Sequence, residues 1–336
     1  MPRLLTCAAG AMACLCLLTG QSPAQKRVAV ARPAPSSPLV RDTTPPPSAA
    51  KGGATRAGPE PARFRPLTAS SFVLSRLDDN VNRDSTGVPS IGMITGLSGR
   101  LESGPARPWL TLEYDVAFHR YSATTRYNRV SQRGRSTIAA RPLRWWTLDL
   151  VTEGALKGSS EDRDVSDQLA VQPRSEFRLG GGRRLRLVGA QRWRRFPDDT
   201  LQDARNRFVA AEFRHRFAEG GEFETEARVE VNDATGARFD YRRTTFATVY
   251  LTPLGSHATL ELEMQYRIQA YPGRLVEIDD QDYRRRDHRL EPAAAFAFRA
   301  GAVTLELSYE PEWRRSNDPT KSVDQHVLLF GLRRRW

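Results

Sequence analysis

The chain has 336 residues, a net charge of +12 and three cysteines. The basic excess falls on no basic helix and no aromatic stacking motif, which argues against nucleic acid as a partner. The apolar run over residues 4–18 is shorter than the ~20 residues that a helix needs to cross a bilayer, and no later stretch is longer. If the chain enters a membrane, it therefore enters as strands.

The first 24 residues read as a secretory signal peptide. Arg3 precedes the apolar run, and the small residues Ser22 to Ala24 form a cleavage site. A lipoprotein signal is the alternative, since Cys14 and Cys16 lie in the run, but the residues before each cysteine fit a lipobox poorly. Cys7 lies in the same segment, so the mature chain has no cysteine for a disulfide, a nucleophile or a metal site.

Residues 25–68 are rich in Pro, Ala, Ser and Gly and have few large apolar side chains. This composition predicts a disordered periplasmic segment. Its eight Lys/Arg against two Asp/Glu carry half of the chain's net charge. The segment is either a solvated spacer or a tether to an anionic partner such as peptidoglycan or a nascent glycan.

Residues 69–336 alternate with a period of two, and we predict an outer-membrane β-barrel. Over residues 258–270, Leu260, Leu262 and Met264 alternate with Glu261 and Glu263. Runs of ~10–14 residues suit tilted membrane-spanning strands better than the shorter strands of soluble proteins. We expect fourteen strands, near residues 70–83, 89–103, 108–121, 128–141, 145–158, 167–179, 183–196, 205–217, 221–233, 240–252, 256–271, 283–299, 302–316 and 323–336. Twelve or sixteen strands, or a soluble β-sandwich or β-helix, are the alternatives.

The connections and aromatic residues orient this barrel. Short turns follow even strands, as at residues 180–182 and 300–301, whereas longer polar loops follow most odd strands, as at 272–282, which predicts periplasmic termini. The last strand ends on Trp336 and resembles the insertion signal read by the barrel-assembly machinery. Aromatic side chains at both interfaces would contact outer-membrane lipid and lipopolysaccharide: Trp109, Trp145, Trp146 and Trp336 at the short-turn end, and Tyr121, Trp193, Tyr271 and Trp313 at the long-loop end.

If the apolar series faces lipid, the polar series lines the lumen. The predicted lumen residues are Glu113, Asp115, Glu224, Glu226, Arg228, Glu261, Glu263, Arg267, Glu306, Glu310, Arg184, Arg186 and Arg214. Acidic and basic residues fall on different strands, which suggests an acidic arc facing a basic arc. Such a lumen is either a water-filled pore with a transverse field or an interior closed by salt bridges.

No catalytic or metal-binding motif is evident, so we expect neither an enzyme nor a cofactor. The five histidines lie on separate strands and far from one another in the sequence. Acidic clusters at residues 161–164, 198–199 and 279–282 fit solvated loop tips, with Ca²⁺ binding or divalent bridging to lipopolysaccharide as the alternative.

One short motif adds a resemblance. Residues 77–83 read Leu-Asp-Asp-Asn-Val-Asn-Arg, which resembles the opening of the outer-membrane β-barrel porins found beside exopolysaccharide biosynthesis genes. The resemblance implies a barrel and a link to glycan traffic, but no catalytic residue. We therefore expect a channel for small polar or anionic solutes, oligosaccharides included. The alternative is a non-conducting structural or assembly barrel of a surface-polysaccharide export system.

Overall fold

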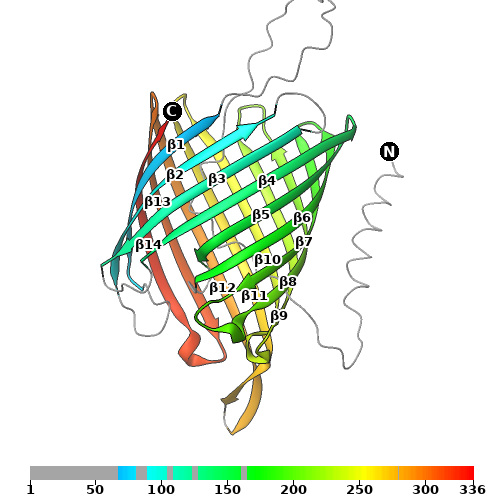
Figure 1. Ribbon diagram of the computed structural model, residues 1–336, viewed down its shortest axis with the longest axis vertical. Coiled ribbons are helices and arrows are strands. Elements are labelled where there is room, and N and C mark those ends of the chain that lie inside the picture. The colour runs from blue at the N-terminus through cyan, green and yellow to red at the C-terminus, as the bar shows by residue number, and fades with distance from the viewer. Residues whose placement is uncertain (1–66, 81–88, 104–108, 123–127, 160–164, 279) are drawn as a thin grey trace, which may run out of the picture.

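The protein forms one closed barrel of fourteen antiparallel strands (Figure 1). The computed structural model describes residues 67–80, 89–103, 109–122, 128–159, 165–278 and 280–336. Each strand pairs with its neighbours in sequence, and β1 pairs with β14 to close the wall. The strands are β1 (Thr68–Asp78), β2 (Ser90–Glu102), β3 (Trp109–Tyr121), β4 (Arg129–Leu143), β5 (Trp146–Ser159), β6 (Val165–Gly180), β7 (Arg183–Arg195), β8 (Ala204–Arg216), β9 (Glu222–Ala234), β10 (Tyr241–Leu254), β11 (Ala258–Ile278), β12 (Gln281–Ala300), β13 (Val303–Ser316) and β14 (Val323–Arg335). The predicted fold and strand number are confirmed.

Alternate residues of each strand lie on opposite faces of this wall. On β11, Leu262, Met264 and Tyr266 are exposed, whereas the intervening Gln265 and Arg267 are buried, with 2% of Arg267 accessible. A single-layer barrel can bury an arginine only on its inside, because nothing covers its outside. We call the positions that carry the exposed large apolar side chains the outer series and the alternating positions the inner series.

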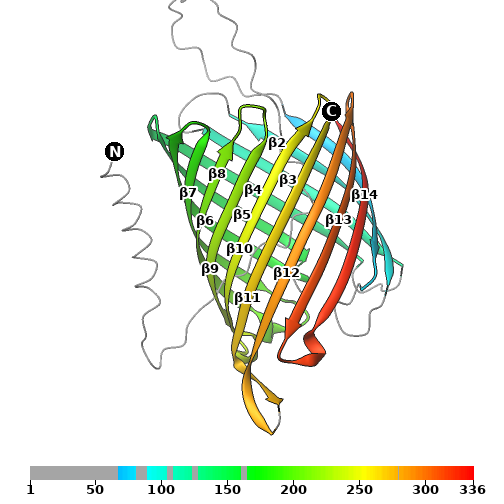
Figure 2. The ribbon, with the colours of Figure 1, turned by 180° about the vertical axis from the view of Figure 1, so that it is seen from behind.

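One end of the barrel carries short turns (Figure 2). Several of them rely on glycine with positive φ, including Gly182 (φ 76°) and Gly301 (φ 62°). A Cβ at Gly182 would lie only 2.4 Å from the carbonyl oxygen of Arg216, so a larger residue would push the two strands apart. The amide of Trp336 donates to the carbonyl of Ala69, so the beginning of β1 and the end of β14 both lie at this short-turn end.

The opposite end carries longer connections, three of them with a 3-10 turn: η2 (Thr200–Gln202), η3 (Ala237–Phe239) and η4 (Pro319–Lys321). The prediction of a loop over residues 272–282 was wrong. β11 and β12 continue outward as a hairpin that projects beyond the other strands (Figures 1 and 2), with Val276 paired to Tyr283. β-branched and aromatic residues favour extended pairing even where no lipid faces them, which the loop assignment overlooked.

Some predicted segments lie outside the described residues: the signal peptide, nearly all of the Pro-rich segment, the turn at 104–106 and the acidic cluster at 161–164. β1 ends at Asp78 instead of continuing to residue 83. Within the described ranges, no helix has the length and apolar character needed to cross a membrane.

Candidate functional site

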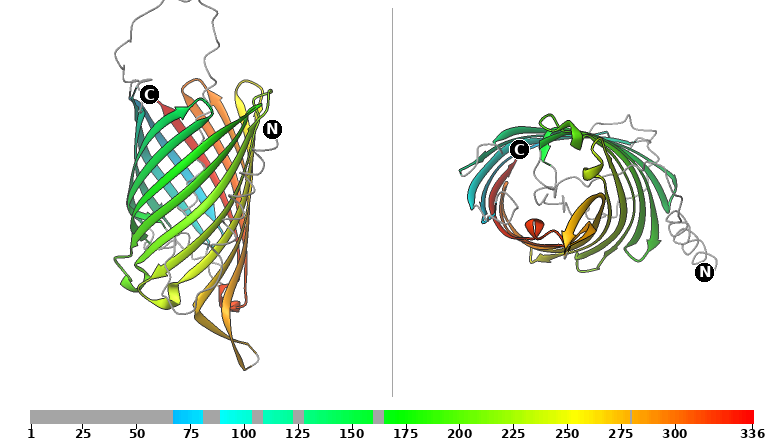
Figure 3. Two further views of the ribbon diagram at one scale, coloured as in Figure 1. Left: turned by 90° about the vertical axis from the view of Figure 1, so that its right-hand side faces the viewer. Right: turned by 90° about the horizontal axis from the view of Figure 1, so that it is seen from below.

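The candidate site is the inner wall of the barrel, which is predominantly ionic. The thirteen predicted lumen residues all occupy the inner series of their strands, as judged from the exposed apolar neighbours and the strand register: Glu113, Asp115, Arg184, Arg186, Arg214, Glu224, Glu226, Arg228, Glu261, Glu263, Arg267, Glu306 and Glu310. The right-hand view of Figure 3, seen from below, shows the strands running around this interior.

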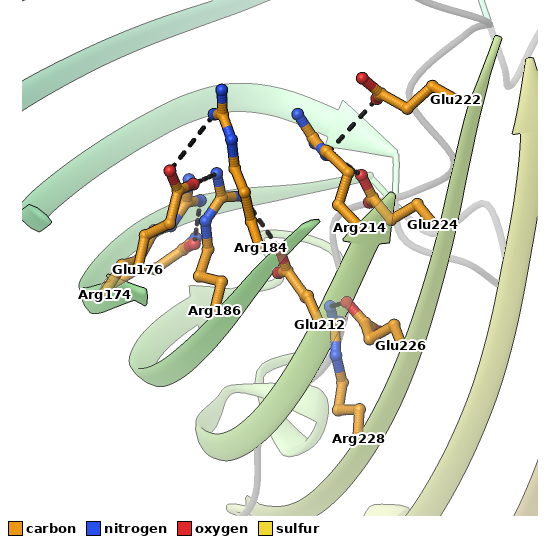
Figure 4. A network of polar contacts seen from close by, with 11 residues as sticks. Arg174, Glu176, Arg184, Arg186, Glu212, Arg214, Glu222, Glu224, Glu226 and Arg228 are labelled. Atoms are coloured by element: carbon orange, nitrogen blue, oxygen red, sulfur yellow. Dashed lines mark hydrogen bonds and ion pairs between the residues drawn. The ribbon is translucent and has the colours of Figure 1, made fainter. Parts of the chain in front are cut away.

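One part of the wall is a network of ion pairs on β6 to β9 (Figure 4). Arg186 lies between two carboxylates, at 2.7 Å from Glu176 and 2.9 Å from Glu212. Arg184 also contacts Glu176, at 3.3 Å, and Arg214 contacts Glu224. Each pair joins adjacent strands, so the network links the wall strand to strand.

Further ion pairs continue this pattern around the barrel. They are Arg100–Glu113, Arg133–Glu153, Arg243–Glu230, Arg267–Glu291, Arg289–Glu312 and Arg333–Glu306. The predicted acidic arc facing a basic arc is therefore wrong. The basic strand β12 lies between the acidic strands β11 and β13, so opposite charges meet along the wall instead of across the lumen.

Several polar atoms on the inner wall have no hydrogen-bond partner among the described residues. Arg192 is 2% exposed and makes no ion pair there, and its Nη1 atom has no hydrogen-bond acceptor. The Oδ1 atom of Asn206, which is fully buried, and the Nε atom of Arg228 are likewise unsatisfied. Leaving such a group dry costs about 1–3 kcal/mol, more when it is charged.

The Asp-Asp-Asn motif closes the barrel between β1 and β14. The buried Asp78 accepts hydrogen bonds from Gln325 Nε2 at 2.6 Å and from the amide of Asn80 at 3.1 Å, and it pairs with Arg76 at 3.0 Å. Asp79 accepts from the amide of His326 at 2.6 Å. Within the described residues 77–80, the motif is thus a structural clasp; Val81, Asn82 and Arg83 lie outside the described part of the chain.

Near this closure the inner wall becomes apolar, which the sequence reasoning missed. Phe72 and Leu74 belong to the inner series of β1, and Leu74 is buried. Gly96 and Gly331 make room for them, because a Cβ would lie 2.5 Å from Phe72 Cζ or 2.3 Å from Leu74 Cδ2, respectively. The sequence signal for this apolar patch was the presence of glycines at inner positions of β2 and β14, where a close approach by a neighbouring side chain is possible.

Five of the eight predicted interface aromatics lie outward: Trp145, Trp146, Trp193, Trp313 and Trp336. The other three belong to the inner series and depart from the prediction. Trp109 pairs with the buried Ala139, and Arg141 lies over its ring; Tyr121 contacts Gly92; and Tyr271 packs on Tyr241 under Arg285. Trp109 and Glu113 are four residues apart on β3, so the alternation of the strand puts both side chains on the inner face.

In the described ranges, no group of three or more histidine or acidic side chains is arranged to hold a metal ion. Two histidines have aromatic partners on the outer series: Tyr266 bonds His288 Nδ1 at 2.8 Å, and Tyr309 bonds His326 Nδ1 at 2.7 Å. These contacts tie neighbouring strands together.

An apolar exterior, an ionic interior and full closure of the sheet define a transmembrane β-barrel. No protein-family model and no curated protein matches the sequence. Among solved structures, the chain is similar to an OmpT loop L8 deletion mutant, an outer membrane protein of Vibrio cholerae (8% identity, 81% of this chain and 99% of that chain, TM-score 0.49). It is also similar to a bacterial polysaccharide outer membrane secretin (12% identity, 80% and 98%, TM-score 0.47) and to an anion-selective porin from Comamonas acidovorans (8% identity, 82% and 100%, TM-score 0.48).

Proposed function

We propose that the protein is an outer-membrane channel for small polar or anionic solutes, with oligosaccharides among the candidates. The carrying observation is the inner wall, where charged side chains of the inner series stay accessible inside the barrel: Arg184 is 37% exposed and Arg133 is 27% exposed. A dry, packed barrel would fill these positions with apolar side chains. Water or a polar solute inside the barrel would solvate these accessible charges.

The unpaired cations support a preference for anions. Arg174 and Arg192 both belong to the inner series, and neither makes an ion pair with a described residue. Arg174 donates only to the neutral Gln172, at 2.8 Å. Glutamates of the same wall, such as Glu176 and Glu212, have arginine partners. Asp149 of β5 lies opposite Arg174 in register and offsets part of this charge. The inner series of β6 and β7 still has an excess of positive charge, which attracts anions; it carries Arg174, Arg178, Arg184, Arg186, Arg192 and Arg194 against Glu176.

The short-turn end, where Trp336 meets Ala69, would face the periplasm, and the projecting β11–β12 hairpin would face outward. The terminal strand β14 would be the element that the barrel-assembly machinery engages. Glycan or peptidoglycan contact by the basic segment before the barrel belongs to the alternative function, a non-conducting assembly barrel.

Liposome swelling tests the proposal. Vesicles that contain the refolded mature protein should swell in isotonic glucose and faster in gluconate, which has a similar size and a negative charge. Folded protein that admits neither solute would overturn the channel and favour the assembly barrel. Equal swelling rates would refute the anion preference alone.

A further inference from the structure

A row of arginines lies on the outside of the barrel at the long-loop end. Arg207 on β8 pairs in register with Val231, Val231 pairs with Arg242 on β10, Arg242 with Ala270, and Ala270 with Arg286 on β12. The three arginines therefore lie on one continuous line across five strands. Neighbouring strands are ~4.8 Å apart, so arginines on every second strand are about 10 Å apart.

This outer arginine row, Arg207, Arg242 and Arg286, is exposed and uncompensated. All three side chains are exposed and belong to the outer series. None makes an ion pair with a described residue, and Arg207 donates only to the amide oxygen of Gln191, at 3.1 Å. The nearby outward acid, Asp233, lies two residues beyond Val231 and pairs in register with Arg205. The row therefore presents net positive charge to its surroundings.

The position of the row identifies the kind of partner. Along the outer face, Val209 follows Arg207 and Phe246 lies four residues after Arg242, and both are exposed members of the apolar exterior. The guanidinium groups thus lie at the edge of the lipid-facing surface, where lipid headgroups begin. Arginine presents a planar fork that binds phosphate oxygens in pairs.

We propose that the outer arginine row binds the phosphate groups of lipopolysaccharide in the outer leaflet. The inference uses the proposed orientation, with the long-loop end outside, but it does not depend on whether the lumen conducts. The phosphorylated glycolipid would lie with its acyl chains against the apolar exterior and its phosphates on Arg207, Arg242 and Arg286. A bound lipid there would also brace strands β8 to β12 from outside.

The test uses the mature protein in detergent micelles, with binding of diphosphoryl lipid A measured by native mass spectrometry. The variant R207Q/R242Q/R286Q should weaken binding at least tenfold. The control R144Q/R183Q/R334Q removes three exposed arginines near the short turns and should bind as the wild type does. Both variants are first checked for heat-modifiable migration, and R242Q alone provides a milder change if the triple variant does not fold.

Unchanged affinity in the folded row variant, or an equal loss in the control, would overturn the proposal. Phosphatidylglycerol distinguishes the lipid source. It should bind the wild type and the row variant alike, and a comparable dependence on the row would mean that any anionic lipid satisfies these arginines. The affinity of dephosphorylated lipid A should be the same for the wild type and for the row variant.

Discussion

Replacing Arg186 by glutamine should destabilise the barrel, because Arg186 is shared by two carboxylates. The side chains of Arg186, Glu176 and Glu212 are 21%, 9% and 17% exposed. Removing one partner of a fully buried pair costs about 3–5 kcal/mol, whereas exposed pairs contribute at most ~1 kcal/mol. At this intermediate burial we expect Arg186→Gln to cost about 2–3 kcal/mol. Glu176 keeps Arg184 at 3.3 Å, so most of the loss falls on Glu212.

The companion change Glu212→Gln makes the reasoning specific. Alone it should cost about 1 kcal/mol, because it loses one charged partner. In the double variant no carboxylate at position 212 is left without its cation, so the combined cost should be smaller than the sum by about 1 kcal/mol. Urea unfolding from lipid vesicles, followed by tryptophan fluorescence, measures all four free energies. Additivity within ~0.3 kcal/mol would refute the network. The exposed pair Arg315–Asp324 is the control and should show no measurable coupling.

Three further predictions test other parts of the barrel. Asp78→Ala removes the clasp between β1 and β14 and should lower the temperature at which the folded gel band is lost, while Asp78→Asn should lower it less. Glu263→Lys should move the reversal potential toward anion selectivity and leave folding normal, since Glu263 makes no ion pair with a described residue. Glu306→Lys should instead reduce the folding yield, because it replaces the carboxylate that pairs with Arg333 by a second positive charge. Burial disfavours ionisation of Asp318, but hydrogen bonds from Thr320 and the charge of Arg274 outweigh it and hold the pKa of Asp318 below its ordinary value. The ion pair between Asp318 and Arg274 of the projecting hairpin should therefore persist above about pH 4 and be lost as the pH falls further. Hydrogen exchange at residues 272–278 measures this loss.

Much of the barrel could be predicted because lipid imposes a simple pattern. An apolar residue at every second position fixes both the strand and its outward face, so Leu262 and Met264 also identify Glu261 and Glu263 as inner residues. Strand edges were less certain where the chain leaves the bilayer. Beyond Ala270 the lipid-imposed alternation no longer applies, and the hairpin depends on pairs such as Val276 and Tyr283.

The inner wall was harder to predict than the outer one. The position of an arginine on the inner series follows from alternation, but its partner depends on strand register, which shifts at irregularities such as the one between Ala140 and Leu143. Arg186 therefore meets Glu212 on β8 as well as Glu176 on β6, a contact invisible in either strand alone. The apolar patch of Phe72 and Leu74 was missed because its signal lies in glycines of other strands.

Single-channel recording of the refolded mature protein in a planar bilayer, under a salt gradient, tests the central claim most directly. The ionic inner wall predicts reproducible ohmic steps, and the unpaired Arg174 and Arg192 predict a reversal potential on the anion-selective side. Replacing both arginines by glutamine should move that potential toward zero. Silence from protein that migrates as a folded barrel would contradict the account and leave a closed, non-conducting barrel.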